Sequence, residues 1–173
     1  MKIVPDATVL IRAHNRSWAL ARRLLHETLE RGHRLVLSNE MIVEVTKVLR
    51  YPHFQNLYGF TDADLLEYAQ FLRSVADLVV LDPRYRAPFL RDSNDADVLQ
   101  TAERGEADIL CTHDGDFFDS AVLAYCAARG IEVCTERPVV AFGGVVIQSG
   151  RELESMTRRK FRKTGDSMQQ SGA

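Results

Sequence analysis

Acidic residues stand at several positions where this chain is predicted to leave a strand or to begin the helix that follows one. Ionised carboxylates that meet at one point repel one another, and the repulsion costs stability unless a cation neutralises it. Their oxygens are hard ligands that suit Mg²⁺ or Mn²⁺. The spacing therefore indicates divalent-cation chemistry, and the acidic residues concerned are Asp6, Glu44, Asp95, Asp114 and Asp116.

The elements that must position these acids alternate between short apolar runs and longer amphipathic ones. We predict strands over residues 2–5, 34–37, 78–81, 108–112 and 131–134, and helices over residues 17–29, 39–50, 61–74, 95–104 and 117–129. Two proline-containing segments, 51–60 and 82–91, are predicted to be loops, and Gly32, Gly105 and Gly130 to end helices. The alternation predicts the α/β class: a three-layer α/β/α sandwich with a central, mostly parallel sheet of about five strands.

The predicted sheet explains why the acids are considered together. In an open parallel sheet, ligands bind outside the carboxyl ends of the strands. Asp6 and Asp114 directly follow predicted strands, and Asp95 begins a helix after a third. Glu44 lies within the helix that follows the second strand. Each acid alone is explained as a helix cap, a turn residue or a solvated charge, but four segments that converge on one edge favour a shared site.

The overall composition is that of a globular protein. Of 173 residues, 46% are hydrophobic, and no apolar run approaches the ~20 residues that span a bilayer. We expect a cytoplasmic protein without a signal peptide or membrane segment. The formal net charge is -2, but residues 151–173 contain six Lys and Arg against three Asp and Glu. We predict a domain over residues 1–142 and a polar, basic and flexible tail over residues 143–173.

Cysteine and histidine do not indicate a site for a softer metal. The three cysteines, Cys111, Cys126 and Cys134, match no metal-ligand spacing and are expected to be small buried hydrophobes. The five histidines have no spacing of the HExxH kind. The hard carboxylate oxygens are therefore the predicted ligands.

Four segments together give the chain a family resemblance: residues 4–11, 38–45, 91–102 and 107–117. In their order and spacing they resemble the PIN-domain family, over about residues 1–140, and within it the VapC-like toxins of toxin–antitoxin systems. Two departures leave the acids in place. Pro5 directly before the first acid is unusual, and Ser93 stands where the subgroup often has proline.

The resemblance implies roles for particular residues. Asp6, Glu44, Asp95 and Asp114 match the family's four acidic, catalytic positions, and Asp116 matches a frequent fifth. It implies that Asp6, Asp95, Asp114 and Asp116 hold one or two Mg²⁺ or Mn²⁺ ions, with Glu44 as a further ligand or as the group that orients water. Asp95 is preferred as the third acid because it stands seven residues before Ala102, whereas Asp92 is expected to shape the turn and Asp97 to extend the acidic face.

The same resemblance implies an activity and partners. The implied activity is that of a metal-dependent endoribonuclease that hydrolyses RNA phosphodiester bonds, as the toxin of a type II toxin–antitoxin pair. It implies a cognate antitoxin protein and a homodimer. Thr8 and Thr112 are expected to hold carboxylates or phosphate by hydrogen bonds. The cations expected to follow the RNA backbone are Arg12, Lys47, Arg50 and Arg91.

Two alternatives remain. A catalytically silent PIN-like module that binds RNA or protein would not need all four acids. A phosphatase that forms an aspartyl-phosphate on Asp6 usually needs a second acid two residues later, where this chain has Thr8. The four acids therefore favour the nuclease.

Overall fold

The computed structural model describes residues 1–14, 20–87, 90 and 92–135. They belong to one compact unit, Met1–Ala141. The start of the helix predicted over residues 17–29 and the flexible tail predicted over residues 143–173 lie outside the described residues. Within the described part of the chain, no helix is both long and apolar enough to cross a membrane.

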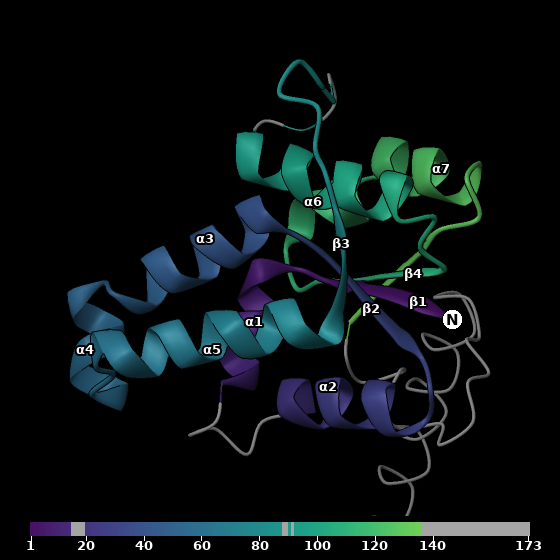
Figure 1. Ribbon diagram of the computed structural model, residues 1–173. Coiled ribbons are helices and arrows are strands. Elements are labelled where there is room, and N and C mark those ends of the chain that lie inside the picture. The colour runs from purple at the N-terminus through teal and green to yellow at the C-terminus, as the bar shows by residue number, and fades with distance from the viewer. Residues whose placement is uncertain (15–19, 88–89, 91, 136–173) are drawn as a thin grey trace, which may run out of the picture. The chain divides into compact units, whose positions relative to one another are not determined.

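The centre of the fold is a parallel sheet whose five strands are all described (Figure 1). The strands are β1 (Lys2–Pro5), β2 (Arg34–Ser38), β3 (Ala76–Val79), β4 (Ile109–Cys111) and β5 (Glu132–Cys134), in the spatial order β3-β2-β1-β4-β5. Ile3 pairs with Leu35 on one side and Ile109 on the other, and all three side chains are buried. This confirms the predicted parallel five-stranded sheet.

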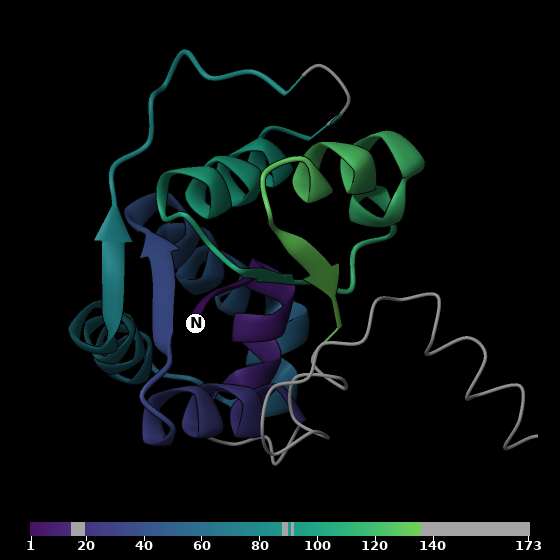
Figure 2. The ribbon, with the colours of Figure 1, turned by 90° about the vertical axis from the view of Figure 1, so that its right-hand side faces the viewer.

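Helices cover both faces of the sheet. They are α1 (Ala7–Ala13), α2 (Leu20–Glu30), α3 (Asn39–Leu49), α4 (Pro52–Tyr58), α5 (Asp62–Val75), α6 (Ser93–Arg104), the short 3₁₀ helix η1 (Gly115–Phe118) and α7 (Ser120–Ala127). Figure 2 shows α6 and α7 on one side of the sheet and α1, α2 and α5 on the other. The chain adds β2 and β3 on one side of β1 and then crosses back to add β4 and β5 on the other side. Because each crossover is right-handed, the helices before and after this reversal cover opposite faces of the sheet. The predicted α/β/α sandwich is confirmed.

Helix caps explain where several helices begin. The Ser38 hydroxyl accepts a hydrogen bond from the Met41 amide at 3.3 Å and so starts α3. Thr61 and Asp64 form a capping box, in which each side chain accepts a bond from the other's backbone amide. Side-chain acceptors of this kind satisfy amides that a helix leaves unpaired in its first turn.

Two helices were not predicted from the sequence. α1 begins directly after Asp6, where only the end of a strand was predicted. α4 occupies most of segment 51–60, so the prediction of a loop there was wrong. Pro52 sits at the start of α4, where a missing amide donor costs nothing, and Gly59 ends it with a positive φ of 58°.

Two other boundaries differ from the prediction. β3 begins at Ala76, two residues before the predicted start. The helix predicted over residues 117–129 is divided, because the Asp119 side chain accepts a bond from the Ala121 amide at 2.8 Å and starts α7 separately from η1. Both differences leave the strand ends, and therefore the acids, on the same edge of the sheet.

Candidate active site

Asp6 lies at the point where the sheet changes its direction of winding. β1 and β4 are neighbours in the sheet, and the connection after β1 leads to β2 on one side whereas the connection after β4 leads to β5 on the other, so the chain leaves these two adjacent carboxyl ends in opposite directions. Ligands in open α/β sheets bind in the crevice at such a point. The Asp6 amide donates to the Cys111 carbonyl of β4 at 2.8 Å, which places the first acid beside the end of that strand.

Two threonines hold the Asp6 carboxylate. Its Oδ2 accepts hydrogen bonds from Thr8 Oγ1 and from Thr112 Oγ1, each at 2.8 Å. Asp6 is only 5% exposed and Thr112 is fully buried. Both hydroxyls bond to the same oxygen, so the carboxylate is fixed in orientation while Oδ1 takes no hydrogen bond that the structure describes. A fixed, buried carboxylate with one unused oxygen has the chemistry of a metal ligand.

Thr112 also connects Asp6 to the acids after β4. Its Oγ1 accepts a hydrogen bond from the Asp114 amide at 2.9 Å. Asp114 Oδ1 in turn accepts one from the Asp116 amide at 2.9 Å, and this starts η1. One chain of hydrogen bonds therefore joins the segments after β1 and β4.

Asp95 completes this group from α6. Its pKa rises to about 7, because of burial first and then because of the negative charges of Asp114, Asp92, Asp6 and Asp116. Charges in salt solution affect one another's pKa only when the groups lie within about 10 Å. The negative charges of Asp6, Asp114 and Asp116 therefore act on Asp95, and these four acids are the group considered below.

The neighbouring acids of α6 are placed differently. Asp92 caps the helix by accepting a hydrogen bond from the Asn94 amide at 2.9 Å, and it adds to the charge around Asp95. Burial also raises the pKa of Asp97, but the charge that contributes there is that of Glu40 on α3. Two residues along a helix correspond to about 200° of rotation, which explains why Asp95 and Asp97 meet different partners.

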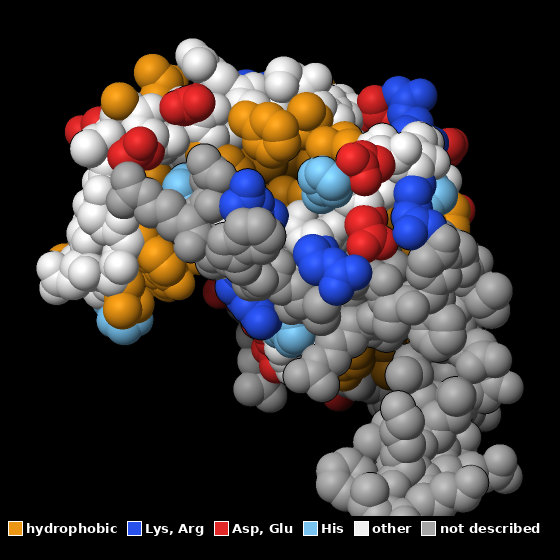
Figure 3. Space-filling view, turned by 90° about the horizontal axis from the view of Figure 1, so that it is seen from below, with side chains coloured by type: hydrophobic (Ala, Val, Ile, Leu, Met, Phe, Trp, Pro, Cys, Tyr) orange, Lys and Arg blue, Asp and Glu red, His pale blue; other side chains and the backbone are white. Residues whose placement is uncertain are grey.

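Glu44 and the predicted RNA-binding cations do not join this group through any contact that the structure describes. Glu44 pairs with Lys47 at 3.5 Å on α3, and its charge is not among those that raise the pKa of Asp95. Arg50 pairs with Asp62 at 3.1 Å. Arg12 is exposed on α1, and Arg91 lies outside the described residues. On the face seen in Figure 3, Lys and Arg side chains lie singly among acidic and hydrophobic ones.

Comparison with known families decides which class of protein this is. The model of the PIN domain matches residues 2–116, which is more than half of the chain. The chain belongs to the PIN domain family. No curated protein matches it. The matched part of this PIN domain begins at β1 and ends at Asp116, so it contains Asp6, Glu44, Asp95, Asp114 and Asp116.

PIN domains are typically nucleases, and the family generally uses divalent metals. Among the described residues, no three Asp, Glu, His or Cys side chains are arranged closely enough to coordinate an ion. The donor set nevertheless has the right chemistry, because its oxygens are carboxylates, and burial together with the charges of Asp114, Asp92, Asp6 and Asp116 raises the pKa of Asp95. A bound cation would offset those negative charges.

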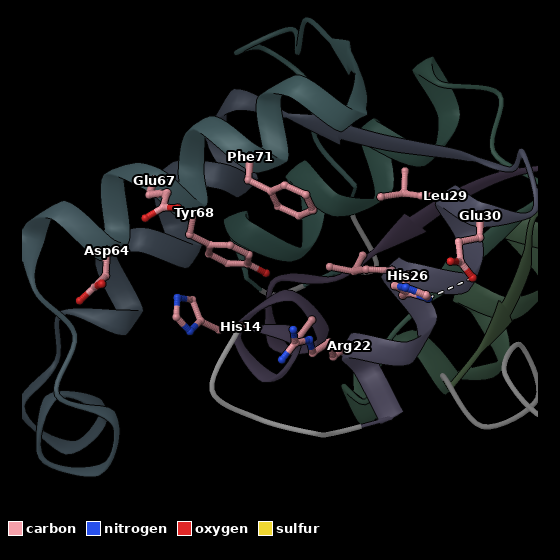
Figure 4. Close-up of a pocket in the computed structure, with 11 residues that line it drawn as sticks. His14, Arg22, His26, Leu29, Glu30, Asp64, Glu67, Tyr68 and Phe71 are labelled. Atoms are coloured by element: carbon pink, nitrogen blue, oxygen red, sulfur yellow. Dashed lines mark ion pairs between the residues drawn. The ribbon is translucent and has the colours of Figure 1, made fainter.

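A cavity of about 530 Å³ lies elsewhere in this PIN domain, at the carboxyl end of α1. Figure 4 shows Tyr68 and Phe71 of α5 on one side of it and His14 and Arg22 on the other. The Tyr68 hydroxyl donates to the Leu10 carbonyl at 2.7 Å and so ties α5 to α1. None of the four clustered acids lines this cavity.

The raised pKa of Asp95 predicts how stability depends on pH. In the unfolded chain Asp95 loses its proton near its ordinary pKa of 3.8, whereas in the folded chain it keeps the proton up to about pH 7. Between these values the unfolded state binds fewer protons, so the free energy of unfolding must fall as the pH rises. We expect this fall in metal-free buffer, measured by urea denaturation at pH 4, 5.5 and 8.

The Asp95→Asn variant isolates the contribution of that one carboxylate. It should be more stable than the natural chain at pH 8, and the difference should shrink as the pH falls toward 4, where Asp95 is protonated in the folded chain and partly protonated in the unfolded one. A difference between the two chains that does not change with pH would contradict the charge repulsion at this edge.

Proposed function

We propose that this PIN domain is a metal-dependent endoribonuclease that hydrolyses RNA phosphodiester bonds. The observation that carries the proposal is the charge-coupled group of Asp6, Asp95, Asp114 and Asp116 at the carboxyl ends of β1 and β4. Such a group suits one or two Mg²⁺ or Mn²⁺ ions. When bound, these ions would polarise a phosphoryl oxygen and lower the pKa of water.

In this proposal the residues of the site have different roles in metal binding and catalysis. Asp6, Asp95 and Asp114 hold the metal, with Asp116 beside them, and the Thr8 and Thr112 hydroxyls keep the Asp6 carboxylate in one orientation. Glu44 orients the attacking water or supplies a further oxygen once substrate is bound. The preference for Asp95 over Asp97 as the third acid is supported by electrostatics, because, besides burial, the charges of Asp114 and Asp6 raise the pKa of Asp95, whereas the charge that raises the pKa of Asp97 is that of Glu40.

We propose further that the protein acts in the cytoplasm as the toxin of a type II toxin–antitoxin pair. The support for this role is the resemblance of its four segments to VapC-like toxins. Arg12, Lys47, Arg50 and Arg91 would follow the RNA backbone, and the partners would be a cognate antitoxin and a second copy of the chain. A solution mass equal to that of one chain would contradict the proposed homodimer. The absence of a small open reading frame beside the gene for this chain would count against the proposed antitoxin.

Metal removal tests the nuclease directly. The full chain, freed of metal with EDTA, should leave a defined single-stranded RNA intact, and added Mg²⁺ or Mn²⁺ should restore cleavage at internal positions. The same RNA with EDTA-treated, heat-denatured protein plus metal controls for contaminating hydrolysis. If the chain binds the RNA but cleaves it with neither ion, the silent binding module is the correct interpretation.

A further inference from the structure

Two of the three cysteines, which were expected only to fill the core, lie directly opposite one another in the sheet. Cys111 ends β4 and Cys134 ends β5, and the two residues are register partners in this parallel pair. Register partners on neighbouring strands point to the same face of a sheet. We propose that Cys111 and Cys134 are a peroxide-sensitive dithiol that closes to a disulfide.

The backbone already provides the separation that a disulfide needs. Neighbouring strands lie about 4.8 Å apart, within the roughly 4.4–6.8 Å between Cα atoms that disulfides span. The Thr112 amide donates to the Cys134 carbonyl at 2.9 Å, which holds the two strand ends side by side. Closing the bond therefore requires side-chain rotation and a small approach of the strands. A bond formed with such strain is readily reduced, as regulatory disulfides are.

The exposure of the two thiols indicates which one reacts first with the oxidant. β5 is an outermost strand of the sheet, drawn as the green arrow in Figure 2. Cys134 on this strand is 8% exposed, whereas Cys111 is completely buried. A small oxidant reaches Cys134 first, and the neighbouring Cys111 thiol is then positioned to complete the reaction.

The chemistry balances with hydrogen peroxide as the oxidant. The Cys134 sulfur attacks one peroxide oxygen, the O–O bond breaks, and a sulfenic acid and one water form. The Cys111 sulfur then attacks the Cys134 sulfur, the S–O bond breaks, and the oxygen leaves as a second water with the remaining thiol proton. Two thiols are oxidised by two electrons in total, and one peroxide is reduced to two waters.

The bond would act on the acidic edge of the sheet. The Cys111 carbonyl accepts a hydrogen bond from the Asp6 amide, and the hydroxyl of the next residue, Thr112, donates one to the Asp6 carboxylate. Drawing β4 toward β5 would therefore move Thr112 relative to Asp6. This part of the inference rests on the proposed function, whereas formation of the bond does not.

Counting thiols in the full chain tests the bond itself. After hydrogen peroxide and then denaturation, the chain should retain one of its three thiols, and peptide mapping should find residues 111 and 134 linked. The matched control is Cys126→Ala. Cys126 is completely buried on α7, and burial raises the pKa of its thiol to about 11, so it should not react and its loss should leave the link unchanged.

The outcomes separate the two parts of the inference. A chain that keeps three thiols, or loses them as sulfinic acids, or links Cys126, overturns the dithiol. Cys134→Ala should keep its two thiols under the same treatment, and mapping of the natural chain still decides if this variant does not fold. If the linked chain cleaves RNA as fast as the reduced one, the coupling to Asp6 is wrong although the bond exists. Slower cleavage that dithiothreitol restores supports the coupling.

Discussion

Asp6→Asn is expected to slow RNA cleavage by more than about 100-fold, because losing a residue that merely supports a metal ligand already costs 10–100-fold. Asparagine keeps the shape of the side chain and can still accept the hydrogen bonds from Thr8 and Thr112. It removes only the negative charge that would bind the cation. The measurement is the cleavage rate of a defined RNA at saturating Mn²⁺ and across a titration of the ion.

Stability must be measured on the same Asp6→Asn protein. One of the charges that raise the pKa of Asp95 disappears, so the variant should unfold at a urea concentration equal to or above that of the natural chain in metal-free buffer at pH 8. A loss of activity without a loss of stability is the signature of a ligand rather than of a structural residue. An inactive variant that is also much less stable would point to a structural role instead.

Asp119→Asn is the matched control for this substitution. Asp119 is exposed, caps α7 through the Ala121 amide, and contributes nothing to the charge around Asp95. Asparagine is as good a helix cap as aspartate, so cleavage should stay within about twofold of the natural rate. Equal rates for Asp6→Asn and Asp119→Asn would show that the carboxylate group at the strand ends is not the active site.

Part of this architecture was readable from the sequence because it depends on local patterns. The apolar runs of the strands and the start of a helix at Thr61 are signals within a few residues. α1 was missed because it is only seven residues long and contains Thr8, Val9 and Ile11, whose β-branched side chains favour strands. α4 was missed because proline and glycine mark its two ends, and the same residues also mark loops.

The candidate site shows the same division between local and long-range information. Asp6 and Asp114 were placed by the rule that acids after parallel strands meet at one edge. The choice between Asp95 and Asp97 depends on how α6 is rotated against the sheet, which no local pattern specifies. The pairing of Cys111 with Cys134 depends on the register of β4 and β5, and it becomes visible only when the strands are assembled.

Gly105→Ala is expected to destabilise the fold by about 1–3 kcal/mol, which is typical of overpacking a core. The sequence predicted that Gly105 ends the helix, and it does so. Gly32 and Gly130 have the positive φ values, 70° and 74°, that favour glycine. The φ of Gly105 is −77°, which any residue adopts. The reason for glycine is space: a Cβ atom there would lie 2.4 Å from Cγ1 of Val36.

The neighbours of Gly105 leave little room for relaxation. Val36 is completely buried in β2, between two other strands, and its branched side chain has few alternative rotamers. The same Cβ would also lie 3.0 Å from the Thr101 carbonyl of α6. The clash must therefore push the end of α6 away from the sheet. Urea denaturation measures the cost, and Gly115→Ala is the control, because a Cβ at Gly115 meets nothing within 4 Å.

A double-mutant cycle with Val36→Ala separates the clash from any general effect of the substitution. Val36→Ala alone removes buried methyl groups and should destabilise the chain. It also removes the atom that a Cβ at Gly105 would strike, so the double variant should be more stable than the sum of the two single effects by about 1 kcal/mol or more. Strictly additive effects would mean that Gly105 is not required by its contact with β2. Because α6 also carries Asp95, a chain that relieves the clash by shifting this helix would change the spacing of the acids as well.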